Sequence, residues 1–130
     1  MIAAEIQIRF GDCDIAGHVH NAAYLHYFES ARIQFFVTEL GPDWDWMKEG
    51  LILKKNTIEY HIPIRLENKI RVEVRTVHIG TKSFTLSYRV LSGDQEMAYG
   101  ESIIVCFNHV DGHTIAIPSG IKEALEKHQE

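Results

Sequence analysis

The chain has 130 residues, of which 45% are hydrophobic and 24% are charged, and its formal net charge is −5. This composition is typical of a folded globular protein, and we expect a single domain over residues 1–130. The acidic balance and the lack of a lysine and arginine cluster argue against a nucleic-acid partner. No apolar run approaches the roughly 20 residues of a membrane-spanning helix, and the first residues lack a signal-peptide pattern. We therefore expect a cytoplasmic protein without a membrane partner.

The two cysteines, Cys13 and Cys106, are far apart in the sequence and form no CxxC pair. This pattern favours free thiols in a reducing compartment, with Cys106 as a core residue of an apolar run. The eight histidines form no HExxH motif. Residues 12–17 resemble the start of a calcium-binding loop, but Ala23 occupies the position where that loop requires a glutamate. We expect neither a metal ion nor a cofactor.

The first part of the chain predicts one short strand, one loop and one long helix. Residues 5–10 alternate as a strand does, and the glycines and aspartates of residues 11–17 indicate a loop. Residues 22–40 contain neither proline nor glycine, and apolar residues recur there at helical spacing before Gly41-Pro42 ends the helix. Further apolar side chains lie off the main stripe: Leu25, Ile33, Phe36 and Val37. We therefore expect other structure to wrap around this helix.

Long runs rich in β-branched and aromatic residues follow the helix and predict four strands, at residues 51–65, 69–79, 83–91 and 96–108. The connections between them are too short for crossover helices, so we expect neighbouring strands to pair antiparallel as a meander. Residues 113–117 indicate one more short strand. A terminal helix follows Pro118; Ser119 can cap its free amides, and we expect this helix to be peripheral.

One long apolar helix followed by a meander of strands indicates an α+β protein in which a curved sheet wraps around the helix. The hotdog fold has this shape. In a single chain such a sheet has unpaired edge strands, and pairing between two copies would cover them. We therefore expect a homodimer or a homotetramer.

The loop before the long helix concentrates titratable side chains, with two aspartates and two histidines among residues 9–21. The N-terminus of a helix offers free N–H groups and a partial positive charge, which stabilise the oxyanion formed when a carbonyl is attacked. A carboxylate beside it can attack the carbonyl or activate a water molecule. The segment therefore points to acyl-transfer chemistry.

Residues 10–32, FGDCDIAGHVHNAAYLHYFESAR, resemble the signature of the 4-hydroxybenzoyl-CoA thioesterase family of hotdog enzymes. The chain length, the order of elements and residues 80–84 are also similar, so the resemblance extends over nearly the whole chain. It implies hydrolysis of an acyl-CoA to free acid and CoA, with Asp14 as nucleophile or general base. It also implies that the backbone N–H of Asn21 binds the thioester oxygen, while the Asn21 side chain can cap the helix.

The resemblance suggests further site residues. His18 is a third catalytic candidate, which would orient Asp14 or contact the substrate, although the benzoyl enzyme has an aliphatic residue there. Glu29 matches a position that meets a polar acyl end, and the Lys82-Ser83 pair matches a loop near the CoA phosphates. The substrate-binding candidates are Gly17, Tyr24, Glu29, Lys82 and Ser83.

Simpler roles compete with several of these assignments. Asp12 can pair with Arg9, or it can take the catalytic role in place of Asp14. Asp14 itself can form an Asx turn, a common role for aspartate before glycine. Glu29 can pair with Arg32 three residues further along the helix.

Two other functions fit the same residues. A non-catalytic acyl-thioester binding protein would use the same pocket without hydrolysis. A hotdog hydratase acting on enoyl or hydroxyacyl thioesters would use an aspartate and histidine pair, which His18 supplies. An acyl-carrier protein is kept as an alternative to CoA as the acyl carrier.

Overall fold

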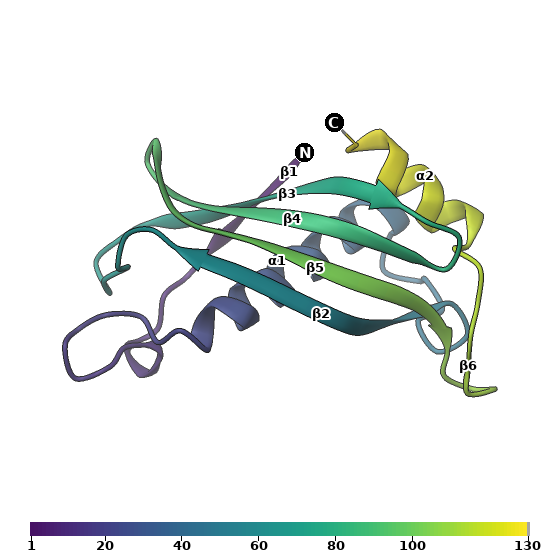
Figure 1. The fold of residues 1–130 in the computed structure, drawn as a ribbon, viewed down its shortest axis with the longest axis horizontal. Helices are drawn as coiled ribbons and strands as arrows, with labels where there is room; N and C mark the ends of the chain where they lie inside the picture. Colours follow the sequence, from purple (N-terminus) through teal and green to yellow (C-terminus); the bar gives the residue numbers. More distant parts are fainter. Residues whose placement is uncertain (130) are drawn as a thin grey trace.

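A computed structural model of the protein describes residues 1–129 (Figure 1). Its elements are, in chain order, β1 (Ile2–Ile6), the 3-10 turn η1 (Phe10–Asp12), α1 (Ala23–Leu40), β2 (Gly50–Tyr60), β3 (Ile70–Ile79), β4 (Ser83–Ser92), β5 (Gln95–Asn108), β6 (His113–Thr114) and α2 (Ser119–Lys127). Within the described residues, no helix is long and apolar enough to cross a membrane.

The strands form one antiparallel sheet in the order β1-β3-β4-β5-β2, with the short β6 joined to β5. The long helix α1 lies across one face of this sheet, and α2 lies at the C-terminal end of α1 (Figure 1). The predicted α+β arrangement, a sheet against one long central helix, is confirmed.

The predicted meander is correct for β3, β4 and β5 but wrong for β2, which pairs with β5 instead of β3. The predicted strand 51–65 ends at Tyr60, so residues 61–69 form a connection much longer than expected. Three strand spacings, about 14 Å, separate β2 from β3, and a connection of this length spans them easily. Pro63 within it lacks the N–H that a continuing strand would use. As a result, β2 lies at an edge of the sheet.

The first strand and the last predicted strand are also shifted or shortened. The N-terminal strand is Ile2–Ile6 instead of residues 5–10, because β1 ends where its pairing with β3 ends, at Ile6 with Ile70. The predicted strand 113–117 is reduced to His113–Thr114, which pairs with the last two residues of β5. The apolar residues that follow, Ile115 and Ile117, instead pack at the margin of the core.

The predicted apolar stripe of α1 is buried against the sheet: Tyr24, Tyr27, Phe28, Ala31 and Phe35. At its centre, the Phe28 ring stacks on Tyr88 of β4 with 4.3 Å between ring centroids. Gly100 of β5 also lies against this ring, and a Cβ atom at Gly100 would overlap it. The close approach of α1 to the sheet therefore requires glycine at this position.

The opposite face of α1 is more open than the sequence predicts. Phe36 is buried as expected, but Leu25, Ile33 and Val37 are 39, 56 and 44% exposed. Nothing in residues 1–129 wraps around this part of the helix, so the expectation of a fully enclosed helix is wrong for these three residues. The exposed apolar face of α1 lies beside the edge strand β2.

The C-terminal helix α2 is an integral part of the core, and the expectation of a peripheral helix is wrong. Its residues Ile121 and Leu125 are fully buried. Just beyond its end, the His128 Nε2 atom lies 2.7 Å from a carboxylate oxygen of Glu39 at the end of α1. The predicted cap at Ser119 is absent, since Pro118 is the N-cap residue and no side chain bonds the first amides. Burial, rather than capping, fixes this helix.

Both cysteines are free thiols, as predicted. Cys106 is fully buried in the core, and burial raises the pKa of its thiol to about 11. A thiol of this kind stays protonated near neutral pH, so Cys106 has the predicted role of a small core residue.

Candidate active site

The loop before α1 is held in place by backbone hydrogen bonds. Cys13 and Val19 form an antiparallel bridge, and the Asp14 N–H donates to the His18 carbonyl over 2.7 Å. The Val19 N–H donates to the Ile64 carbonyl, also over 2.7 Å, which ties the loop to the connection after β2. The turn between Asp14 and His18 contains Gly17 at a φ of 79°, a conformation that glycine adopts readily. The loop therefore presents Asp14 and His18 at fixed positions.

Only one oxygen of the Asp14 carboxylate is used by this loop. The Oδ1 atom accepts hydrogen bonds from the N–H groups of Ala16 at 2.9 Å and His18 at 3.0 Å. The Asx turn expected as a structural role is thus present. For the Oδ2 atom no hydrogen-bond donor is found within residues 1–129. One edge of the carboxylate is anchored and the other is available to a ligand.

The same hydrogen bonds favour the ionised form of Asp14. The bond from the His18 N–H lowers the pKa of Asp14 below its ordinary value, and the Ala16 N–H and the charges of His18 and His20 act in the same direction. Desolvation opposes these effects only in part. Asp14 is therefore a carboxylate at neutral pH, as a nucleophile or general base must be.

Asp12 has a very different environment. It is only 8% exposed, and its Oδ2 atom accepts from the Arg9 N–H at 3.0 Å and the Tyr27 hydroxyl at 2.8 Å. The Arg9 guanidinium lies 3.3 Å from Oδ1. Burial acts to raise the pKa of Asp12, but the bonds from Arg9 and Tyr27 outweigh it and keep the pKa below the ordinary value. The predicted pairing of Asp12 with Arg9 is confirmed.

Asp14 opens into a cavity of about 330 Å³ between the start of α1 and the end of β2. Its walls come from two separate parts of the chain: Asp14, His18, Val19, Asn21 and Tyr24 on one side, and Tyr60, His61, Ile62 and Pro63 on the other. The rings of Tyr24 and Tyr60 meet edge to face with 4.9 Å between centroids, and the Tyr60 hydroxyl lies 3.4 Å from the Asn21 carbonyl oxygen. Burial raises the pKa of Tyr24, so it remains a protonated phenol.

The turn before α1 leaves one backbone donor unpaired at a residue that lines this cavity. The N-cap residue is Ala22 and no side chain bonds the first amides, so the predicted capping by the Asn21 side chain is wrong. The Asn21 carbonyl accepts from the Tyr24 N–H instead. No acceptor for the Asn21 N–H itself is found in the part of the chain that the structure describes. An unpaired N–H at a helix start is suited to binding a carbonyl oxygen or an oxyanion.

The structure brings some of the predicted site residues together and separates others. Asp14, His18, Asn21 and Tyr24 line one cavity, and Gly17 belongs to the loop that shapes it. The other candidates, Glu29, Lys82 and Ser83, do not line it. The side chain of Lys82 bonds Thr114 at 3.3 Å. The turn between β3 and β4 that carries Lys82 lies toward α2 and the C-terminal end of α1, opposite the end where the Asp14 loop joins the helix (Figure 1). A single chain therefore does not unite all the predicted contacts.

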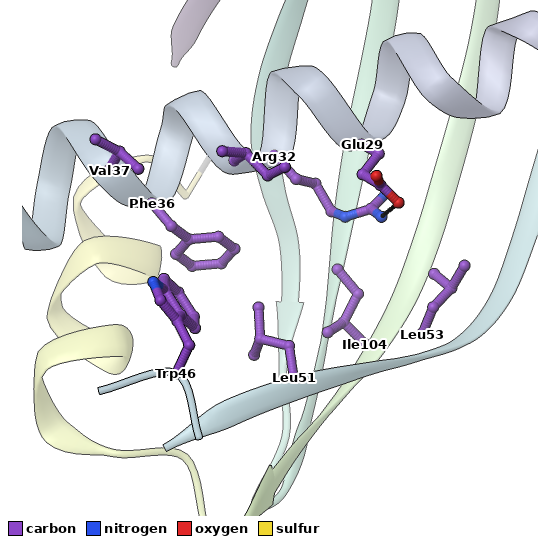
Figure 2. Close-up of a pocket in the computed structure, with 9 residues that line it drawn as sticks. Glu29, Arg32, Phe36, Val37, Trp46, Leu51, Leu53 and Ile104 are labelled. Carbon is purple, nitrogen blue, oxygen red and sulfur yellow. Dashed lines mark ion pairs between the residues drawn. The ribbon is translucent and has the colours of Figure 1, made fainter. Parts of the chain in front are cut away.

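Glu29 instead lines a second cavity of about 510 Å³, between the C-terminal half of α1 and the start of β2 (Figure 2). Its walls are mostly apolar: Ile33, Phe36, Val37, Trp46, Leu51, Leu53 and Ile104. The charged exceptions are Glu29 and Arg32, whose closest oxygen and nitrogen atoms are 4.0 Å apart. The predicted pairing of Glu29 with Arg32 is thus present, at a long distance.

Two polar residues of the first cavity, Tyr60 and His61, and the whole second cavity were not predicted from the sequence. Tyr60 is 39 residues from Asn21 in the chain, and no local motif marks it. Its position follows from the pairing of β2 with β5, which the predicted meander did not contain. No group of three or more His, Cys, Asp or Glu side chains that could hold a metal ion occurs among residues 1–129.

The family comparison agrees with this geometry: residues 8–125 match the Thioesterase-like superfamily. The chain belongs to this superfamily. The prediction of a thioesterase is therefore confirmed, while the narrower resemblance to 4-hydroxybenzoyl-CoA thioesterases stays a prediction.

Two curated relatives of the chain carry names of the same kind. The acyl-CoA thioester hydrolase YbgC of Escherichia coli O6:H1 is 22% identical over 119 residues, which is 89% of each chain. A 1,4-dihydroxy-2-naphthoyl-CoA hydrolase of Synechococcus elongatus is 26% identical over 123 residues, which is 92% of this chain and 90% of the relative.

Solved structures confirm the hotdog thioesterase fold. A protein of Pseudomonas aeruginosa strain PAO1 superimposes with a TM-score of 0.92 at 23% identity and covers 100% of this chain and 92% of its own. A thioesterase of Thermus thermophilus, solved with coenzyme A and Zn, has a TM-score of 0.84 at 30% identity, with 96% and 91% of the two chains covered.

Proposed function

We propose that the protein hydrolyses an acyl-CoA to the free acid and CoA, with Asp14 as the catalytic carboxylate. The observation that carries this proposal is the combination of an ionised carboxylate with one uncommitted oxygen and the unpaired Asn21 N–H beside the same cavity. Membership of a thioesterase superfamily supports the reaction class.

In the proposed reaction the thioester carbonyl oxygen accepts a hydrogen bond from the Asn21 N–H, where the start of α1 stabilises developing negative charge. If Asp14 is the nucleophile, its Oδ2 atom attacks the carbonyl carbon, CoA thiolate leaves, and water then hydrolyses the resulting anhydride. If Asp14 is the general base, it takes a proton from the water that attacks the same carbon. Both routes end with free acid, CoA and a regenerated carboxylate.

The neighbouring residues have positioning and binding roles in this proposal. The His18 N–H anchors Oδ1 and thereby leaves Oδ2 to react, while His18 lines the cavity, where its ring would contact the substrate. Gly17 allows the turn that brings the two residues together, and Tyr24 forms a wall against the thioester. Glu29 would face the far end of an acyl group that reaches the second cavity.

We further propose that the active form is a homodimer or a homotetramer. Within one chain β2 pairs only with β5 among the described strands, and Ile52 and Leu53 on β2 are exposed. Pairing of this edge with a second copy would cover it. The Lys82 and Ser83 contacts to the CoA phosphates would then come from the other copy, since within one chain this turn lies toward the opposite end of α1 (Figure 1).

A hydratase is the second candidate, because Asp14 and the His18 ring line the same cavity and such an enzyme uses an aspartate and histidine pair. A hydratase would change the absorbance of an enoyl thioester without releasing thiol. A non-catalytic binding protein would bind the thioester stoichiometrically with neither change.

The proposal is tested by measuring thiol release from a panel of aromatic and aliphatic acyl-CoAs, with the matching acyl-carrier-protein thioesters in parallel. We expect turnover by the wild type and a loss of about 10²- to 10⁴-fold in Asp14→Asn, the usual range for a catalytic acid or base. The circular dichroism spectrum of the variant should match that of the wild type, because asparagine keeps the Oδ1 acceptor for the Ala16 and His18 N–H groups. A folded wild type that releases no thiol from any member of the panel would contradict the proposal.

A further inference from the structure

Both cavities are lined by residues of α1 or of the turn before it together with residues in or next to β2, one cavity toward each end of the helix. At one end Tyr60 of β2 bonds the Asn21 carbonyl; at the other, Leu51 and Leu53 of β2 line the cavity shared with Glu29. Between these ends α1 carries Leu25, Glu29 and Ile33 at a spacing of four residues, and Asn21 lies two residues before the helix begins. Because residues at this spacing lie on one side of a helix, the exposed Leu25 side chain lies along α1 between the proposed reaction centre and the second cavity.

Arg32 is the unusual feature of the second cavity. Its side chain is only 13% exposed, and it extends along α1 toward Glu29 in a cavity whose other walls are apolar (Figure 2). Its Nη1 atom donates to the buried Tyr88 hydroxyl at 3.2 Å. A guanidinium has five N–H donors, and this is the one hydrogen bond found for Arg32 within residues 1–129.

Glu29 does not satisfy the remaining donors. Its side chain is 62% exposed, and its Oε2 atom is 4.0 Å from Arg32 Nη2, beyond hydrogen-bond distance. A charge held in a mostly apolar cavity is stable only when it is paired or hydrated. Among the described residues, the guanidinium edge that faces the cavity therefore has no anion at hydrogen-bond distance, and a planar carboxylate is the group that fits it bidentately.

We propose that the substrate is an acyl thioester whose far end carries a carboxylate, which Arg32 binds in the second cavity. This inference rests on the function proposed above and names the substrate class for the same site. The thioester lies at Asn21, the hydrocarbon chain follows the exposed apolar face of α1 past Leu25, and the terminal carboxylate pairs with Arg32. Tyr88 holds the guanidinium from behind and fixes its orientation.

The spacing along α1 sets the length of this chain. Eight residues separate Asn21 from Glu29, the level that the Arg32 guanidinium reaches, and this corresponds to about 12 Å along the helix axis. An extended hydrocarbon chain of about ten carbons covers that distance. The geometry therefore favours a medium-length dicarboxylic acyl group over short ones.

The test is a comparison of kcat/KM for matched pairs of CoA thioesters that differ only at the far end. The pairs are hexanoyl and hexanedioyl, octanoyl and octanedioyl, and decanoyl and decanedioyl, the second of each being the mono-thioester. We expect the wild type to prefer the carboxylated member, most strongly at decanedioyl. In Arg32→Met this preference should fall by about tenfold to a hundredfold, the usual range for a hydrogen-bonded charge pair.

Two further variants separate recognition from a purely structural role of Arg32. Arg32→Lys keeps the charge but loses the planar fork, so it should restore part of the preference. Glu29→Gln removes a carboxylate that competes for Arg32, so it should raise the preference above that of the wild type. Lys122→Met, which removes an exposed cation of α2 away from both cavities, is the matched control and should leave the preference unchanged.

Each result is a ratio of two substrates in one preparation, so partial unfolding of a variant does not affect it. Wild-type hydrolysis without a preference for the carboxylated chains, or a preference that survives in Arg32→Met, overturns this inference and leaves the proposed hydrolysis intact. If no thioester is hydrolysed, calorimetric titration with the thioether analogue of decanedioyl-CoA tests whether Arg32 binds the terminal carboxylate. Equal dissociation constants for the wild type and Arg32→Met would then overturn the inference on its own.

Discussion

Asp12 and Asp14 are two residues apart in one loop, yet their carboxylates have opposite surroundings. Asp12 is buried and both of its oxygens are occupied, by the Arg9 main chain and guanidinium and by the Tyr27 hydroxyl. Asp14 lines a cavity, and only one of its oxygens is bound, to two backbone N–H groups, while the other has no donor among the described residues. In both cases hydrogen bonds lower the pKa.

The comparison shows that a lowered pKa alone does not identify a reactive carboxylate. Asp12 is ionised, but both of its oxygens are bonded within the protein. It links the loop to α1 and has no oxygen left for a substrate. Asp14 is kept ionised by hydrogen bonds from N–H groups of its own loop. These bonds leave its second oxygen without a partner among the described residues. Reactivity in this account depends on the uncommitted oxygen and on the neighbouring Asn21 N–H.

The largest effect on stability is expected for Asp12→Ala. The substitution leaves the buried Tyr27 hydroxyl and the Arg9 N–H without their partner, so the free energy of unfolding in urea should fall by about 2 to 3 kcal/mol. Because the folded pKa of Asp12 is lowered, its stabilisation is present above the unfolded-state pKa and is lost as the pH falls through the folded pKa. The difference in the free energy of unfolding between Asp12→Ala and the wild type should therefore become smaller in acid. Equal unfolding curves at neutral pH would show that Asp12 is not a structural link.

Tyr27→Phe should have a smaller effect of the same kind. It removes one 2.8 Å hydrogen bond to Asp12 but leaves the Arg9 contacts and the packing of the ring, so a loss of about 1 kcal/mol is expected by urea denaturation. With Asp12→Ala already present, the further loss should be much smaller, because the two residues share one interaction. Fully additive losses would contradict the direct link between them.

The pH dependence of hydrolysis is a further test of the role of Asp14. The change in rate expected over the ordinary pH range is the smallest of these effects. Since the Asp14 pKa is lowered, its carboxylate is lost only as the pH falls below the usual aspartate range, and kcat/KM should show no Asp14 limb between about pH 7 and pH 5. His18→Gln is the control, because a limb that disappears in this variant belongs to His18. A limb in this range that persists in His18→Gln would contradict the lowered pKa of Asp14.

The sequence predicts the helix and the motif loop well because their signals are local. Helical spacing in α1, the glycine and proline after Leu40, and the two aspartates and two histidines of the loop all act over a few residues. The placement of β2 is not local, because it depends on pairing with β5 residues 38 to 57 positions later in the chain. The predicted strand 51–65 extends past Pro63, whereas β2 ends at Tyr60.

The two cavities could not be predicted from the sequence for the same reason. Each is formed by α1 and β2 together, so a misplaced β2 removes Tyr60 from the first cavity and Leu51 from the second. Capping was also misjudged at Asn21 and Ser119, because a residue with the right side chain does not cap a helix unless its backbone has the N-cap conformation. Side-chain type alone did not carry that information.

The most direct test of the account compares Asp14→Asn with Asp12→Asn in one thiol-release assay on the wild type's best thioester substrate, with each rate divided by the folded fraction. We predict that Asp14→Asn loses turnover by at least about a hundredfold, while Asp12→Asn stays within a few-fold of the wild type and is instead less stable. Retained turnover in Asp14→Asn together with its loss in folded Asp12→Asn would mean that Asp12 carries the reaction and would contradict the account.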